Sequence, residues 1–274
     1  MLPIKYSAQQ TEPIDLPKEQ LPTMYDLSSE DPEEPGLPDE FHDFQPDLLR
    51  ITFRPPNYPK DRVFSACDLN LYYDVRHPKW YKRPDWFGVV EVPRLYAGYD
   101  LRLSYVIWQE GVNPLVVVEL LSPGTEKEDL GEIDRDTTEN PPGKWEVYEQ
   151  ILQIPYYVVF DRYTDRLRAF TLVSGRYQEL ELTEPRIWMP LLELGLGLWQ
   201  GECQGVDRLW LRWYDAEGNW ILTEVEQERQ EKEFAQQQLE SSQQQLESTQ
   251  QQLENERQRV AELAQRLRDL GIEM

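Results

Sequence analysis

The feature that most constrains the fold is one short apolar run, Leu115–Leu121, with the sequence LVVVELL. Both alternating sets of side chains in this run are apolar, with Glu119 as the exception. A strand of this kind has to be covered on both faces, which is typical of the centre of a sheet in an α/β protein. The sequence therefore predicts a central, fully covered strand here.

The residues that follow this strand predict a crossover connection. Trp145, Tyr148 and Leu152 have the i, i+3, i+7 spacing of a helix that faces the core, and Pro-Pro-Gly precedes them as a start signal. The segment Tyr156–Asp161 (YYVVFD) then has the composition of a second strand. Because the order is strand, helix, strand, we expect the two strands to be parallel.

Other short segments are rich in β-branched and aromatic residues and are bounded by turn residues, which is the pattern of strands. They are Leu48–Phe53, Val63–Asp74, Trp86–Val92, Arg166–Val173, Arg176–Leu182 and Leu209–Thr223. Ser-Gly separates Arg166–Val173 from Arg176–Leu182, so these two segments are predicted to form a hairpin. The segment Leu209–Thr223 is predicted to form another hairpin. The whole pattern predicts an α/β fold.

The composition divides the chain into three parts. Residues 1–40 are rich in Pro and acids and predict an irregular arm. Residues 41–223 form the predicted domain, and a chain of 274 residues suits one such domain with an appendage. Residues 224–274 contain no Pro and repeat QQQLESS, QQQLEST and QQQLENE with a period of seven, which predicts a long polar helix.

The heptads of this helix support a coiled coil only in part. One seam is apolar throughout, at Leu239, Leu246, Leu253, Val260 and Leu267. The second seam is Ser242, Thr249 and Glu256 before it becomes Leu263 and Leu270. A coiled coil needs both seams apolar. Two interpretations stay open: a solvated helix, or a weak homodimer through the C-terminal end.

The formal charge of −23 is concentrated at the two ends of the chain. Residues 1–50 carry 12 acids and 3 bases, and residues 224–274 carry 12 acids and 6 bases, which leaves −8 for the middle. Proteins that coat DNA without sequence preference rely on an excess of Lys and Arg, so the composition argues against that class. The composition is still compatible with a locally basic cleft, and an acidic site suits a bound cation.

The sequence also predicts a cytoplasmic protein. It lacks the roughly 18 to 20 consecutive apolar residues of a membrane span, and its first residues lack the layout of a signal peptide. The two cysteines, Cys67 and Cys203, have neither metal-ligand spacing nor the number expected of a disulfide framework, so we expect both to be reduced.

Two acids are the first candidates for chemistry. Glu119 lies inside an apolar strand, where a carboxylate is costly unless it is paired or binds a metal. Asp85 follows Pro84 at the start of the predicted strand Trp86–Val92, where an acid is commonly a turn former. An ion pair for Glu119 and a turn for Asp85 are the structural alternatives. If the two strands are adjacent, both carboxylates can share a hard cation such as Mg²⁺.

Lysine is the third candidate residue type. Lys144 begins the predicted helix, where the helix dipole disfavours a cation, and from there its ammonium can fold back over the acids. Lys127, in the loop before it, is the rival and is expected to be more solvated. The two histidines, His42 and His77, do not support a triad or a zinc site, and no phosphate-binding glycine loop is present.

Taken as a set, these motifs resemble a known family. The set consists of Arg-Pro-Asp85 before a strand, Val-Glu119-Leu-Leu-Ser-Pro-Gly-Thr, Asp129-Leu-Gly, Lys144-Trp-Glu-Val-Tyr148 and Pro-Tyr-Tyr-Val-Val-Phe-Asp161. It is similar to the bacterial restriction endonuclease family of the PD-(D/E)xK nuclease superfamily, over roughly residues 41–214. The resemblance implies a mixed sheet with flanking helices.

The resemblance also implies roles for individual residues. Asp85 and Glu119 match the metal-binding acids, and the Leu120 carbonyl is implied as a third ligand. The usual lysine position after Glu119 is occupied by Leu121, so Lys144 on the following helix is the match for the lysine.

The function that we predict from these residues is Mg²⁺- or Mn²⁺-dependent hydrolysis of DNA phosphodiester bonds, with Asp85, Glu119 and Lys144 as catalytic residues. The alternative is a catalytically silent module with the same fold, which acts through the acidic arm and the C-terminal helix. The charge of −23 favours the alternative, and the intact Asp, Glu and Lys positions favour the enzyme.

Overall fold

The computed structural model describes residues 39–122, 126–132 and 141–269. The arm predicted at residues 1–40 therefore lies outside the described residues except for its last two. The chain divides into two compact units, Met1–Asn219 and Trp220–Met274. Each unit is described by itself below.

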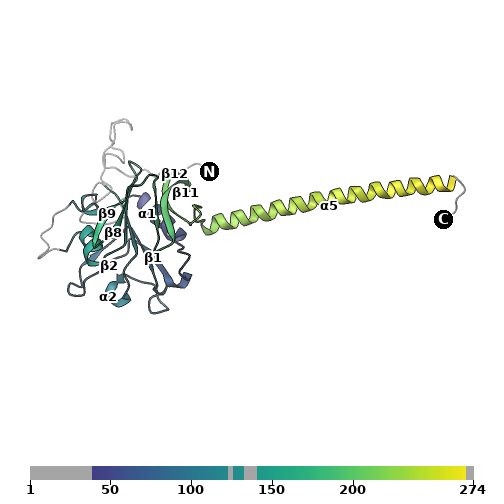
Figure 1. Cartoon of the computed structure of the whole chain (residues 1–274). Coiled ribbons are helices and arrows are strands. Elements are labelled where there is room, and N and C mark those ends of the chain that lie inside the picture. The colour runs from purple at the N-terminus through teal and green to yellow at the C-terminus, as the bar shows by residue number, and fades with distance from the viewer. Residues whose placement is uncertain (1–38, 123–125, 133–140, 270–274) are drawn as a thin grey trace, which may run out of the picture. The chain divides into compact units, whose positions relative to one another are not determined.

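The first unit contains a six-stranded sheet with the order β1-β4-β6-β7-β8-β9 (Figure 1). Its strands are β1 (Val63–Cys67), β4 (Trp86–Val90), β6 (Val116–Leu120), β7 (Tyr156–Asp161), β8 (Arg166–Val173) and β9 (Arg176–Glu179). β6 and β7 lie side by side at the centre and are parallel, with Val116 opposite Tyr156, whereas the other pairs are antiparallel. Every residue of β6 is buried, as the apolar run predicts. The α/β fold with a mixed sheet is thus confirmed.

The crossover between β6 and β7 is helical, as predicted, but its helix is not regular. It contains α3 (Glu126–Asp129), α4 (Lys144–Glu146) and a π-helical turn, η3 (Val147–Ile151). Tyr148 and Leu152 are buried, which confirms the core-facing side. The predicted helix is thus present over Lys144–Ile151, with a π-helical second half, and wider π turns of this kind often occur at functional sites.

The prediction of a strand at Leu48–Phe53 was also wrong, because this segment forms the second half of helix α1 (Phe41–Thr52). The six-residue window looked like a strand because it is short and apolar. Over the whole helix the buried residues recur with helical spacing: Phe41, His42, Gln45, Pro46, Leu48, Leu49 and Thr52. The period of 3.6 therefore decides the structure, and only the longer window reveals it.

A second sheet of the first unit has the order β10-β11-β12. Its strands are β10 (Arg186–Met189), β11 (Leu194–Cys203) and β12 (Val206–Tyr214). The predicted hairpin within Leu209–Thr223 was wrong in its partner, because β12 pairs with β11, which precedes it. Helix α1 packs on β12, where the Gln45 side chain donates to the Leu211 carbonyl at 2.9 Å and accepts from the Leu211 N–H at 2.7 Å. The predicted β8–β9 hairpin is confirmed.

A third, small sheet has the order β3-β2-β5. Its strands are β2 (Leu71–Tyr72), β3 (Tyr81–Lys82) and β5 (Tyr105–Val106). Two short helices complete the unit, η2 (Lys60–Arg62) and α2 (Ile107–Glu110). β3 ends three residues before Asp85, so this sheet leads directly into one of the candidate acids.

The second unit contains one helix, α5 (Glu224–Asp269), which confirms the long C-terminal helix (Figure 1). Its start is closed by a capping box, because the Thr223 hydroxyl accepts from the Glu226 N–H and the Glu226 carboxylate accepts from the Thr223 N–H. The seam residues Leu239, Leu246, Leu253, Val260 and Leu263 are exposed. The Leu267 side chain and all of Leu270 lie outside the described residues. Among the described residues, no helix is long and apolar enough to cross a membrane.

We expect deletion of residues 224–274 to leave the thermal stability of the first unit almost unchanged. The apolar side chains along α5 are exposed, so the deletion removes little buried apolar surface. Thermal unfolding of the full chain and of the shortened chain, followed by circular dichroism, measures the effect. Insolubility of the shortened chain, or a loss of several kcal/mol, would contradict this expectation.

Candidate active site

Glu119 is the centre of a buried polar cluster. Its side chain, on β6, is fully buried. The hydroxyl of Tyr148 donates to Oε1 at 2.8 Å, and the ammonium of Lys144 donates to Oε2 at 3.0 Å. The backbone N–H of Asp85 also donates to Oε2, at 3.3 Å. The structural alternative for Glu119, an ion pair, is therefore present, and its partner is the predicted lysine.

Asp85 is brought to this cluster by the pairing of β4 with β6. The last register pair on that side is Trp86 with Val118, so Asp85 lies beside Glu119 and Leu120. The Leu120 N–H donates to Asp85 Oδ2 at 2.6 Å, in return for the bond from the Asp85 N–H to Glu119. The two acids thus fix each other's backbone. The pairing of β4 with β6 therefore brings the Asp85 motif and the Glu119 motif together at the end of these two strands.

Lys144 lies at the start of α4 and points into the cluster, with its side chain 14% exposed. Its Nζ is 3.0 Å from Glu119 Oε2 and 2.8 Å from Asp129 Oδ1. The rival lysine, Lys127, is exposed on α3. The structure therefore brings Asp85, Glu119 and Lys144 together.

Asp129 is a member of the cluster that the sequence analysis did not select. It is the last residue of α3 and is fully buried. Its Oδ2 has no hydrogen-bond partner among the described residues, and its Oδ1 has only the ion pair with Lys144. The signal in the sequence was weak, because a single acid in an acid-rich loop looks like a solvated residue.

The charges of this cluster do not balance. Three carboxylates, those of Asp85, Glu119 and Asp129, share the ammonium of Lys144. Burial and the charges of Asp129 and Asp85 raise the pKa of Glu119 well above its usual value, although Lys144 opposes this shift. Burial also raises the pKa of Asp85, against the opposing charge of Lys144. Burial alone would lower the pKa of Lys144, but the three acids outweigh it and raise that pKa.

His42 is a second residue that the sequence analysis missed, and it supports the cluster from α1. It is buried, with Nδ1 3.0 Å from Asp39 Oδ1 and Nε2 3.1 Å from the Leu120 carbonyl oxygen. A carboxylate and a carbonyl oxygen can only accept, so both ring nitrogens have to donate. The ring is therefore an imidazolium. Burial would lower its pKa, but Asp39 and the charge of Asp85 raise it.

We expect His42 to be mostly protonated at pH 6.5, where a free imidazole is half protonated. Because its folded pKa is raised, its contribution to stability is complete below about pH 6.5 and is lost as the pH rises through the folded pKa. Nitrogen-15 NMR of the imidazole rings measures the protonation state, and the variant His77→Asn assigns the signals. A neutral His42 ring at pH 6 would contradict the bonding described above.

The cluster fits a hard cation in its chemistry, although it holds Lys144 in the present arrangement. Within the described ranges, no group of three or more His, Cys, Asp or Glu side chains has the arrangement of a metal site. The donors are nevertheless carboxylates in excess over cations, and Asp129 Oδ2 lacks a partner. Carboxylates and carbonyls are the ligands that Mg²⁺ and Mn²⁺ prefer. The Leu120 carbonyl accepts one bond from His42, which leaves it a second lone pair.

A comparison with protein families gives a match over most of the chain. The sequence model of a family described as "Putative restriction endonuclease" (Uma2) matches residues 14–209. This range includes all the residues of the cluster. Among curated proteins, nothing matches the chain.

Proposed function

Because the chain belongs to the Uma2 family, whose description is "Putative restriction endonuclease", we propose that it is an endonuclease that hydrolyses DNA phosphodiester bonds with the help of Mg²⁺ or Mn²⁺. The observation that carries the proposal is the convergence of Asp85, Glu119 and Lys144, from three separate segments, at one edge of the central sheet. The nuclease domain would comprise residues 41–223.

Two carboxylates and one carbonyl would hold the metal ion: Asp85, Glu119 and the Leu120 oxygen. A bound divalent ion supplies a Lewis acid and lowers the pKa of a water molecule. The hydrogen bond from Tyr148 to Glu119 Oε1 fixes the carboxylate in one orientation. The Leu120 N–H, which donates to Asp85 Oδ2, does the same for the second acid, and the Asp85 N–H in turn donates to Glu119 Oε2.

Lys144 would act on the phosphate and the attacking water. Its ammonium carries a fixed positive charge that can stabilise the negative charge that develops on the phosphate, and it can orient the water. The fully buried carboxylate of Asp129, 2.8 Å away, holds the ammonium in place. In this scheme Asp129 is a positioning residue, because it acts through Lys144.

A cleavage assay tests the proposal. Supercoiled plasmid, linear duplex and single-stranded DNA are incubated with the full chain in Mg²⁺, in Mn²⁺ and in EDTA. We expect cleavage in at least one metal and none in EDTA. If no DNA is cut in either metal by protein that is folded by circular dichroism, the endonuclease proposal fails.

The rival function is an interaction module with the same fold and no catalysis, and the charge of −23 favours it. A catalytically silent module needs no metal, so its stability would not respond to Mg²⁺ or Mn²⁺. Metal-dependent stability therefore separates the two functions even where the DNA target is unknown.

We also propose that α5 associates weakly with a second copy of the chain. Its last heptads have apolar residues on both seams, at Val260, Leu263, Leu267 and Leu270, and the Val260 and Leu263 side chains are exposed. Weak pairing is expected because Ser242 and Thr249 occupy the second seam. Sedimentation equilibrium of the chain with and without residues 224–274 tests this, and a monomeric mass for both chains at high concentration would refute it.

A further inference from the structure

The connection between β2 and β3 carries an unusual concentration of positive charge. The segment Tyr72–Arg83 (YYDVRHPKWYKR) contains four Lys or Arg residues and one acid, in a chain whose formal charge is −23. Arg76 and Lys79 are exposed, and 84% of the Arg76 side chain is accessible. Arg76 Nε donates to Asp74 Oδ1 at 3.3 Å, and the high exposure leaves the rest of its guanidinium open to an anionic partner.

The same segment contains aromatic rings, and the ring of Trp108 packs against it. Tyr81 and Trp108 are 43% and 36% exposed, and both contact Tyr72. The ring centroids of Tyr72 and Tyr81 are 5.4 Å apart, and those of Tyr72 and Trp108 are 6.4 Å apart. Exposed aromatic faces next to cations are what a strand with unstacked bases requires, because any base can stack on them.

The tip of the connection is held rigid by its own contacts. Asp74 accepts from the Arg76 N–H at 2.9 Å and pairs with His77 Nδ1 at 2.8 Å. The His77 ring stacks on Trp80, with centroids 3.9 Å apart and planes at 9°. A surface that is already ordered loses little conformational entropy on binding.

The same segment is joined to the candidate active site. Lys82, at its end, is buried and lies 3.0 Å from the Glu128 carboxylate, one residue before Asp129. The Asp68 N–H donates to the Asp85 carbonyl oxygen at 3.2 Å, just beyond the segment. A strand bound along Tyr72–Arg83 would therefore lead toward the acids.

We propose that Tyr72–Arg83, together with Trp108, forms a basic and aromatic clamp that binds a DNA strand with unpaired bases. Arg76 and Lys79 contact phosphates, and Tyr81 and Trp108 stack on bases. The inference rests on the proposed function for its substrate, DNA, and it specifies that the preferred substrate is single-stranded or locally unpaired. The net negative charge of the chain agrees with binding through a small local clamp, because this charge disfavours broad contact with a duplex.

Binding of fluorescent dT20 to the full chain in EDTA tests the clamp, because cleavage is then excluded. We expect Arg76→Gln with Lys79→Gln to weaken binding about tenfold at low salt. The same pair should lower the slope of log affinity against log salt by about 1.4, the value for two phosphate contacts on a single strand. Tyr81→Ala with Trp108→Ala should weaken binding by at least about thirtyfold, from two stacked bases, and leave the salt slope unchanged.

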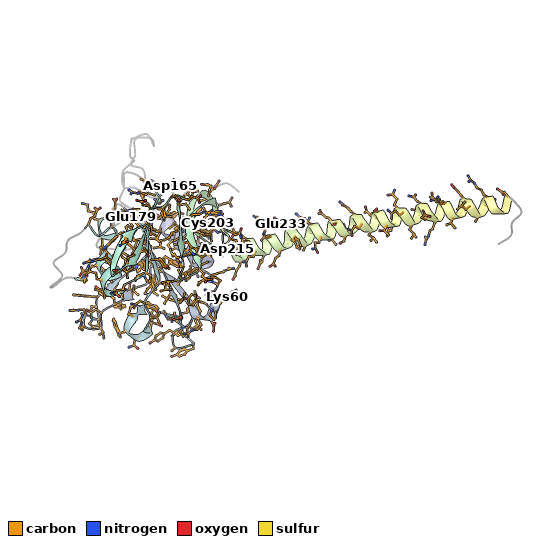
Figure 2. The ribbon with its side chains drawn as sticks, viewed as in Figure 1. Lys60, Asp165, Glu179, Cys203, Asp215 and Glu233 are labelled. Atoms are coloured by element: carbon orange, nitrogen blue, oxygen red, sulfur yellow. The ribbon has the colours of Figure 1, made fainter. Side chains whose placement is uncertain are left out.

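The matched control is Lys60→Gln with Arg62→Gln, which removes the same charge from η2. Figure 2 labels Lys60 at the lower right of the domain. In the same view in Figure 1, β2 is on the left side of the domain, so the two lie apart. The control should bind like the unchanged protein. Equal losses in the control and the clamp variants would overturn the proposal, and so would unchanged binding in both clamp pairs. Tighter binding of a 20-base-pair duplex than of dT20 would overturn the preference for unpaired bases.

The outcome also separates this inference from the proposed function. If the unchanged protein cuts DNA and the clamp variants bind and cut equally well, the clamp fails and the endonuclease stands. If dT20 binds through the clamp and no DNA is cut in any metal, the clamp stands and the endonuclease fails. Circular dichroism of each variant shows that it is folded, and Arg76→Lys with Lys79→Arg should restore the affinity.

Discussion

We expect Glu119→Gln to lower DNA cleavage by at least about 10²- to 10³-fold, the range for loss of one preorganised charge. We also expect it to abolish the stabilisation of the protein by Mg²⁺ or Mn²⁺. The same change should leave the metal-free protein as stable as before, or make it more stable. Loss of function without loss of stability is the pattern of a residue selected for its site.

The physical reason is the excess of acid around Lys144. The folded pKa of Glu119 is raised well above its usual value by burial and by Asp129 and Asp85. Its contribution to stability is therefore complete below about pH 4.5 and is lost as the pH rises through the folded pKa. Wherever the carboxylate is ionised it is a cost to the metal-free protein, and Gln removes this cost. Its amide oxygen can still accept from Tyr148, whereas its NH2 cannot accept from Lys144 or the Asp85 N–H, which offsets part of the gain.

Thermal unfolding with and without metal, at pH 8, measures the response. For the unchanged protein the stabilisation follows RT ln(1 + [L]/Kd), about 1.4 kcal/mol when metal is tenfold above its Kd. Glu149→Gln is the matched control, since Glu149 is also buried but is satisfied by Arg176 and by the Tyr177 N–H, both at 2.8 Å. It should lose about 1 to 3 kcal/mol and keep both the metal response and cleavage. A Glu119→Gln variant that still responds to metal would remove Glu119 from the metal site.

The second large effect is expected from Lys144→Met, which keeps the apolar stem and removes the ammonium. Three carboxylates then share a buried site with no lysine, and the loss of one partner from a buried ion pair costs about 3 to 5 kcal/mol. Metal binding should persist, because its proposed ligands are intact. Turnover should fall by about 10²- to 10³-fold, because the charge that stabilises the phosphate is gone.

Urea unfolding and single-turnover cleavage measure the two effects separately. Lys127→Met is the matched control, because Lys127 is exposed on α3 and its loss should change stability by less than about 0.5 kcal/mol. A Lys144→Met variant that is destabilised but cuts DNA at the normal rate would show that Lys144 is only the ion-pair partner of Glu119. Rescue of its stability by Mn²⁺ would show that a metal cation can replace the missing charge.

Much of the site could be predicted from the sequence because its residues violate local rules. Glu119 interrupts an apolar strand, and Lys144 begins a helix at the end that disfavours a cation. Each is a local conflict that a site can explain. Asp129 and His42 were missed for the opposite reason. An acid in an acid-rich loop and a histidine at the start of a helix are both ordinary, and only their burial makes them informative.

The sequence by itself determined the central strand, its parallel partner and the long C-terminal helix, because apolar periodicity over five or more residues depends on the chain alone. The tertiary structure made plain that Leu48–Thr52 belongs to a helix, since the residues that α1 buries recur with a period of 3.6 that the six-residue window was too short to show. It also decided that β12 pairs backward with β11. Above all, it decided that three carboxylates share one lysine, because a charge balance arises only between segments that folding brings together.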